Sequence, residues 1–133
     1  MASSFFYSQG RVKLAIVGRW IGPEDVVVEL TGGDHPHIGA VALAQLRPSL
    51  KNPNEVSGTT SVLTCLGHQE DDLARGMASR IAKQAKMNTV VICGIHLDDI
   101  SEEEIRDVLT GAALLEDEVL RWIAEQKGTQ LSD

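Results

Sequence analysis

Residues 11–20 alternate between apolar and polar side chains, and this alternation constrains the fold more than any other stretch of the chain. Val12, Leu14 and Ile16 point one way, while Arg11 and Lys13 point the other way and are expected to be solvated. A period of two with one polar face predicts a half-buried strand. We expect further strands at residues 5–8, 26–30, 40–46, 59–66 and 88–95, and a surface loop at residues 47–58.

The second half of the chain carries apolar residues at helical spacing. Between residues 70 and 86 the apolar stripe consists of Leu73, Ala74, Met77, Ala78, Ile81, Ala82 and Ala85. Glu70, Asp71 and Asp72 stand at the start of this predicted helix, where carboxylates complement the helix dipole. We therefore expect these three carboxylates to be solvated.

A capping signal predicts where a second helical segment begins. Ser101 is placed to cap the helix, and Glu104 is placed to return the bond as a capping box. Ile100 and Ile105 fit the accompanying hydrophobic staple. A last helix is expected over residues 112–127, with Gly128 placed to end it.

The order of these elements indicates the fold class. Strands come mostly first and helices mostly later, which predicts one α+β domain over residues 1–133, with an ordered core of about residues 4–127. We expect an antiparallel sheet with about three helices packed on it. In such an arrangement the helices leave one face of the sheet uncovered, and a homodimer would bury that face.

Charge and hydropathy exclude some functions. The formal net charge is −7, which argues against a nucleic-acid binder that neutralises phosphates. The apolar runs fall far short of the roughly 20 residues that span a bilayer, and the start of the chain lacks a signal pattern. We expect a cytoplasmic protein without membrane contact. Cys65 and Cys93 both lie in apolar runs and are expected to be buried thiols.

A loop rich in glycine and histidine joins two of the predicted strands, at residues 31–39. Gly32 and Gly33 permit positive φ, so open backbone N–H groups there could form an anion nest. The spacing fits neither a dinucleotide fingerprint nor a Walker A loop. The alternative is a tight connection that needs glycine for its geometry and Pro36 for stiffness.

The chain has four histidines, His35, His37, His68 and His96, and all lie at predicted strand ends or in loops. If these ends meet, the imidazoles share one pocket, where they could bind a ligand, a partner or a metal. Ordinary surface histidines remain the alternative. Asp98 and Asp99 could orient His96 or bind a cation, or form a polar turn ahead of Ser101. No nucleophile constellation occurs, so no catalytic residue is assigned.

Two strings carry a resemblance to a known family: residues 30–39, read Leu-Thr-Gly-Gly-Asp-His-Pro-His-Ile-Gly, and residues 93–96, read Cys-Gly-Ile-His. With residues 68–72 and 77–81 between them, they resemble the D-subunit proteins of gallate and related hydroxyaryl decarboxylases, which are described as prenylated-flavin chaperones. The resemblance covers about residues 11–122.

The resemblance implies a fold like that of proteasome-assembly chaperones, commonly dimeric. It also implies a role beside a UbiD-type, non-oxidative aromatic acid decarboxylase that uses prenylated FMN, in which this small protein helps the cofactor arrive or mature and does not itself decarboxylate. The positions that match the family's motifs are Gly32, Gly33, Pro36, His37, Gly39, His68 and His96.

Three hypotheses follow from the sequence. The first is an accessory chaperone for prenylated FMN, with transient cofactor binding. The second is a small metal-dependent enzyme with His37, His68 and His96 as ligands. The third is a structural assembly subunit whose glycine–histidine loop docks to a partner without touching the cofactor.

Overall fold

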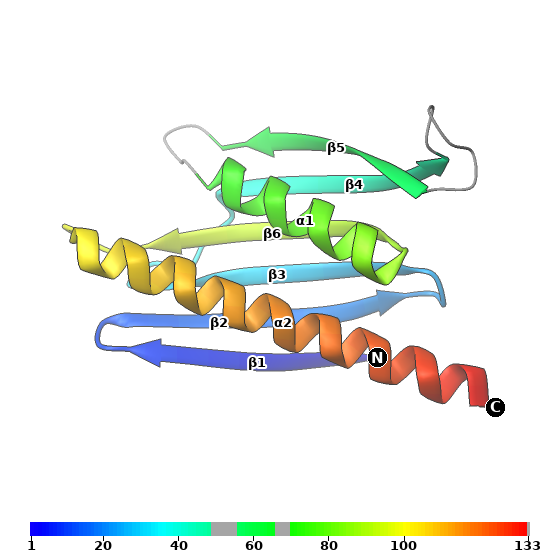
Figure 1. Cartoon of the computed structure of the whole chain (residues 1–133). Coiled ribbons are helices and arrows are strands. Elements are labelled where there is room, and N and C mark those ends of the chain that lie inside the picture. Colours follow the sequence, from blue (N-terminus) through cyan, green and yellow to red (C-terminus); the bar gives the residue numbers. More distant parts are fainter. Residues whose placement is uncertain (49–55, 66–69, 133) are drawn as a thin grey trace.

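In the described part of the chain, six strands form one sheet and two helices lie on one of its faces (Figure 1). The computed structural model describes residues 1–48, 56–65 and 70–132. The elements are β1 (Ala2–Gln9), β2 (Val12–Ile21), β3 (Asp25–Gly33), β4 (Ala40–Pro48), β5 (Val56–Thr64), α1 (Asp71–Ala85), β6 (Asn88–His96) and α2 (Glu102–Ser132). The α+β class predicted from the sequence is confirmed.

The sheet is mixed, so the expectation of a purely antiparallel sheet is wrong. Its order is β1-β2-β3-β6-β4-β5, and β3 pairs with β6 in parallel while the other neighbours are antiparallel. Helix α1 carries the chain from the edge strand β5 back across the sheet, so that β6 enters between β3 and β4. Val91 and Cys93 of β6 are fully buried, as expected of a central strand.

The two later helical segments are one helix, α2, which corrects the expected total of three. The capping box at its start is confirmed: the backbone N–H of Glu104 donates to Ser101 Oγ at 3.1 Å, and that of Ser101 donates to Glu104 Oε1 at 3.0 Å. Gly111 does not interrupt the helix. A Cβ there would lie 2.4 Å from the ring of Tyr7, so this glycine permits close packing of α2 on β1. Gly128 does not end the helix either, since α2 runs to Ser132.

The predicted strands are all present, and several are longer than expected. Strand β5 ends at Thr64, and Leu66, the predicted end of that strand, lies outside the described residues. Strands β4 and β5 extend into the predicted loop at residues 47–58, where Pro48 and Val56 are paired. Residues 49–55 of that prediction lie outside the described residues. No helix in the described ranges is both long and apolar enough to cross a membrane.

The helices cover one sheet face, and the other face carries its own apolar rows. Helix α1 lies over β4, β5 and β6, and α2 lies over β1 and β2 (Figure 1). Ile16, Leu30 and Cys93 face the helices and are fully buried. The next cross-strand row, on the opposite face, consists of Ser4, Val17, Glu29, Ile92, Val41 and Leu63. We call this opposite side the open face.

Candidate functional site

The glycine–histidine loop crosses the ends of the two parallel strands. Gly33 at the end of β3 pairs with His96 at the end of β6, so both strands finish at one edge of the sheet. The loop is tied to β6, because the N–H of Asp34 donates to the His96 carbonyl at 2.6 Å and that of Gly39 to the Cys93 carbonyl at 2.9 Å. The carboxyl ends of parallel strands are a common place for ligand crevices.

Gly32 and Gly33, where an anion nest was expected, belong to strand β3, and the N–H groups that follow them are engaged. The N–H of His35 also points to the His96 carbonyl, at 3.3 Å, so the N–H groups of Asp34, His35 and Gly39 are all directed at β6. Gly33, with φ 78°, permits this turn, and a Cβ there would lie 2.1 Å from the His96 carbonyl oxygen. The loop is therefore a tight connection, as the alternative interpretation held.

Gly94 sets how closely the loop approaches β6. A Cβ on Gly94 would lie 1.6 Å from the carbonyl oxygen of His37, so no other residue fits beneath the loop as it stands. Gly39 plays a similar part for Glu70, because a Cβ there would lie 2.4 Å from Glu70 Oε2. Gly32 instead packs against β2, with its Cβ position 2.2 Å from the carbonyl oxygen of Lys13.

The loop and β6 bring three of the four histidines together. The rings of His35 and His96 are centred 5.4 Å apart, and those of His37 and His96 6.5 Å apart. Pro36 lies exposed between the two loop histidines. His68, which the resemblance places in the same site, lies outside the described residues.

Asp98 joins two of these imidazoles. Its carboxylate lies 3.0 Å from His96 Nε2 and 3.4 Å from His35 Nε2. These contacts, His96 first and His35 second, hold the pKa of Asp98 below its usual range. The interpretation in which Asp98 orients His96 is thus supported by geometry. Asp98 sits among exposed groups, so the pair is open to solvent.

His37 contacts Glu70, a residue that the sequence did not single out for the site. His37 Nδ1 lies 2.8 Å from the carbonyl oxygen of His35, which can only accept, so Nδ1 carries a proton. His37 Nε2 lies 3.1 Å from Glu70 Oε1.

The expectation that Glu70 is a solvated helix-start carboxylate is wrong. Its side chain is only 13% exposed, and the backbone N–H of Ile95 lies 3.4 Å from Oε1. Oε2 is buried and has no hydrogen-bond partner among the described residues. Nothing local separates Glu70 from Asp71 and Asp72. The place of Glu70 in the site follows only from the fold, which brings its carboxylate against Gly39 and His37 of the loop.

Arg11 links this edge to the start of α2. Its guanidinium is bidentate to Glu104, with contacts of 2.8 and 2.9 Å, and it donates to the Asp98 carbonyl at 2.9 Å. It also lies 3.4 Å from Asp34 Oδ2, which accepts from the Asp98 N–H at 3.1 Å. Arg11 was expected to be solvated. It is half-exposed, but its guanidinium is engaged, so we call these four residues the Arg11 network.

The thiols of Cys65 and Cys93 differ in their exposure to solvent. Cys93 is buried, and burial, followed by the charge of Glu70, raises its pKa to about 12. Cys65 is exposed, which corrects the prediction of two buried thiols, and its N–H donates to the Gly39 carbonyl at 2.8 Å. Within residues 1–48, 56–65 and 70–132, no group of three or more His, Cys, Asp or Glu is placed to hold a metal.

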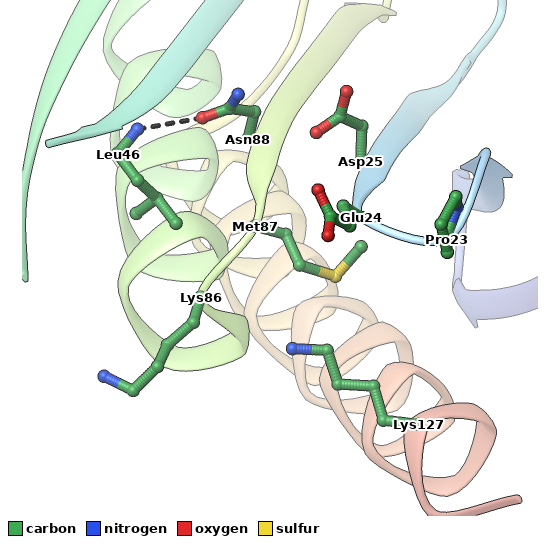
Figure 2. A pocket seen from close by; sticks show the side chains of 8 residues that line it. All are labelled: Pro23, Glu24, Asp25, Leu46, Lys86, Met87, Asn88 and Lys127. Carbon is green, nitrogen blue, oxygen red and sulfur yellow. Dashed lines mark hydrogen bonds between the residues drawn. The ribbon is translucent and has the colours of Figure 1, made fainter. Parts of the chain in front are cut away.

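A cavity lies at the opposite end of the sheet, away from the glycine–histidine loop. Its volume is about 320 Å³, and Figure 2 shows Glu24 and Asp25 at the start of β3 beside Met87 and Asn88 at the start of β6. Asn88 Oδ1 accepts from the N–H of Leu46 at 2.9 Å, and Lys127 Nζ donates to the Ala85 carbonyl. Asn88 and Lys127 therefore bind main-chain groups of the fold, and no residue of the predicted site lines this cavity.

The candidate site is thus the edge formed by His35, His37, His96, Glu70 and Asp98, which we call the histidine edge. Its imidazoles have ring nitrogens that can donate hydrogen bonds, and Glu70 and Asp98 lie 3.0–3.4 Å from these nitrogens. A family model described as "Prenylated flavin chaperone LpdD-like domain" matches residues 8–124. No curated protein matches the chain.

The Arg11 network leads to a test by pH. The hydrogen bond from Arg11, followed by that from Ser101, lowers the pKa of Glu104 from 4.5 to about 2. A carboxyl whose pKa is depressed by folding stabilises the fold above its unfolded pKa and loses that effect as the pH falls toward the folded value. We expect the free energy of unfolding to fall between about pH 4.5 and pH 2, and to fall less in Glu104→Gln.

Denaturant unfolding at a series of pH values measures this effect. Glutamine also serves a capping box, so Glu104→Gln removes the charge for Arg11 and keeps the cap. Glu103→Gln is the matched control, because Glu103 makes no ion pair within the described residues. An equal pH slope in wild type and Glu104→Gln would contradict the role of the Arg11 network.

Proposed function

The chain belongs to the prenylated flavin chaperone LpdD-like family, and from this membership we propose that it holds prenylated FMN at the histidine edge for a UbiD-type decarboxylase. The observation that carries the proposal is the meeting of His35, His37 and His96 at the carboxyl ends of β3 and β6. Ligands often bind in the crevice outside such strand ends. The protein acts in the cytoplasm and catalyses no reaction itself.

The chemistry of the edge suits a flavin that is held briefly. Imidazole N–H groups can donate to the pyrimidine carbonyls or the phosphate of FMN, and protonated imidazoles add positive charge. His35 and His96 are largely open to solvent, with side chains 64% and 47% exposed. A ligand lying there keeps one side free. Such an open site allows transfer to a partner, as a carrier requires, rather than permanent retention.

Co-expression tests the proposal. We expect a UbiD-type decarboxylase made together with the wild-type chain to be several-fold more active than the enzyme made alone. His37→Ala and His96→Ala should reduce this gain, because each removes an imidazole from the edge. Decarboxylase activity and flavin absorbance per enzyme are the measurements.

Lys83→Ala is the control, since Lys83 is exposed near the far end of α1 from Glu70. It should leave the gain unchanged. No gain with the wild-type chain would overturn the proposal. A full gain with both histidine variants would contradict the histidine edge as the cofactor site.

We further propose that the open face of the sheet binds a second copy of the chain. Leu63 on β5 and Phe6 on β1 are 78% and 77% exposed there, and Val17, Val41 and Ile92 lie between them. Exposed apolar side chains gathered on one face, here interrupted by Glu29, are typical of an interface. Arg19 and Glu29 lie on the same face, so a two-fold arrangement can bring the arginine of one copy to the glutamate of the other.

Light scattering of the purified chain tests the dimer. We expect wild type at twice the mass of one chain, and Leu43→Glu at the mass of one chain, because Leu43 lies on the open face next to Val90. Leu114→Glu, an exposed leucine on α2, should remain dimeric. A monomeric wild type, or a dimeric Leu43→Glu, would contradict the proposed interface.

A further inference from the structure

An apolar groove adjoins the histidine edge. Its volume is about 250 Å³, and its apolar lining consists of Leu73, Ile95, Ile100, Ile105, Val108 and Leu109. Ile105 and Leu109 on α2 are 45% and 55% exposed. Ile100 and Ile105 were expected to form a hydrophobic staple, but both keep a large exposed fraction and line this groove. We call it the isoleucine groove.

Glu70 is shared by the groove and the histidine edge. It lines the isoleucine groove, while its Oε1 contacts His37 Nε2 at 3.1 Å. The backbone N–H of Ile95, which also lines the groove, lies 3.4 Å from the same Oε1. The groove and the histidine edge therefore meet at Glu70, with an apolar part between the helices and a polar part at the sheet edge.

The size of the groove argues against a whole cofactor lying in it. Pockets that enclose a ligand of drug size usually measure about 300–1,000 Å³, and the groove measures about 250 Å³. Its lining is mostly apolar, whereas the flavin ring edge and the ribityl phosphate are polar. A small apolar substituent fits the lining, and the polar remainder of the ligand fits the neighbouring imidazoles.

Resting on the proposed function, we propose that the isoleucine groove receives the isoprenoid-derived ring of prenylated FMN. This ring is the part that distinguishes the prenylated cofactor from FMN, and it is a five-carbon apolar unit. Apolar side chains stabilise such a unit by removing it from water, and FMN, which lacks the unit, does not gain this stabilisation. The groove thereby lets the protein select prenylated FMN over FMN, whose polar groups match the histidine edge equally well.

Titration of the purified full-length chain with FMN and with prenylated FMN tests this. We expect wild type to bind prenylated FMN more tightly, by roughly tenfold or more, as is common for apolar pockets. Leu109→Ser should remove most of that preference by weakening prenylated FMN alone. Ile105→Trp, which fills the groove, should do the same. Leu114→Ser is the matched control, because Leu114 lies on the same helix and is 52% exposed.

The outcomes distinguish a failure of the groove proposal from a failure of the proposed function. If wild type binds neither flavin, the proposed function fails and the groove proposal fails with it. If wild type binds both flavins and Leu109→Ser leaves both affinities unchanged, or weakens both equally, only the groove proposal is overturned. If the groove variants bind both flavins normally but lose the decarboxylase in a pull-down, the groove is a protein-docking surface instead, which also overturns the proposal. His37→Ala should weaken both flavins.

Discussion

The close approach of the glycine–histidine loop to β6 is the constraint on which the site depends. The His37 carbonyl sits where a Cβ on residue 94 would be, and the N–H groups of Asp34 and Gly39, on either side of His37, donate to β6 carbonyls. Backbone groups therefore hold the loop in place against β6. Because β6 lies parallel to β3 in the middle of the sheet, the end of each strand meets the loop at one edge. A strand order without this insertion would separate His96 from the loop.

Helix α2 extends this edge into a two-part site. The Arg11 network holds the start of α2 against the turn after β6, through the bidentate contact with Glu104 and the bond to the Asp98 carbonyl. The same first turns of α2 carry Ile105 and Leu109, which wall the isoleucine groove. The charged network and the groove thus depend on one placement of the helix. If one ligand spans both parts, as we propose, a short chain with few aromatic residues offers it polar and apolar contacts together.

Local patterns in the sequence predicted the parts of the fold that local physics determines. Alternation gave the bounds of β2 closely, and the capping box at Ser101 predicted where α2 begins. The parallel placement of β6 could not be predicted, because it depends on where α1 carries the chain after β5. The continuity of α2 was missed for a related reason, since Gly111 is explained only by the ring of Tyr7 on another element.

The same division applies to the candidate site. The loop and His96 were found from their composition and position, whereas Glu70 was not, because its contact with His37 crosses 33 positions of sequence and resembles an ordinary helix start. The most direct test of the account is an imidazole ¹H–¹⁵N spectrum of the chain during titration with prenylated FMN. The account predicts that the signals of His35, His37 and His96 shift together with one saturation point. Saturable binding of prenylated FMN that leaves these three signals unchanged would contradict it.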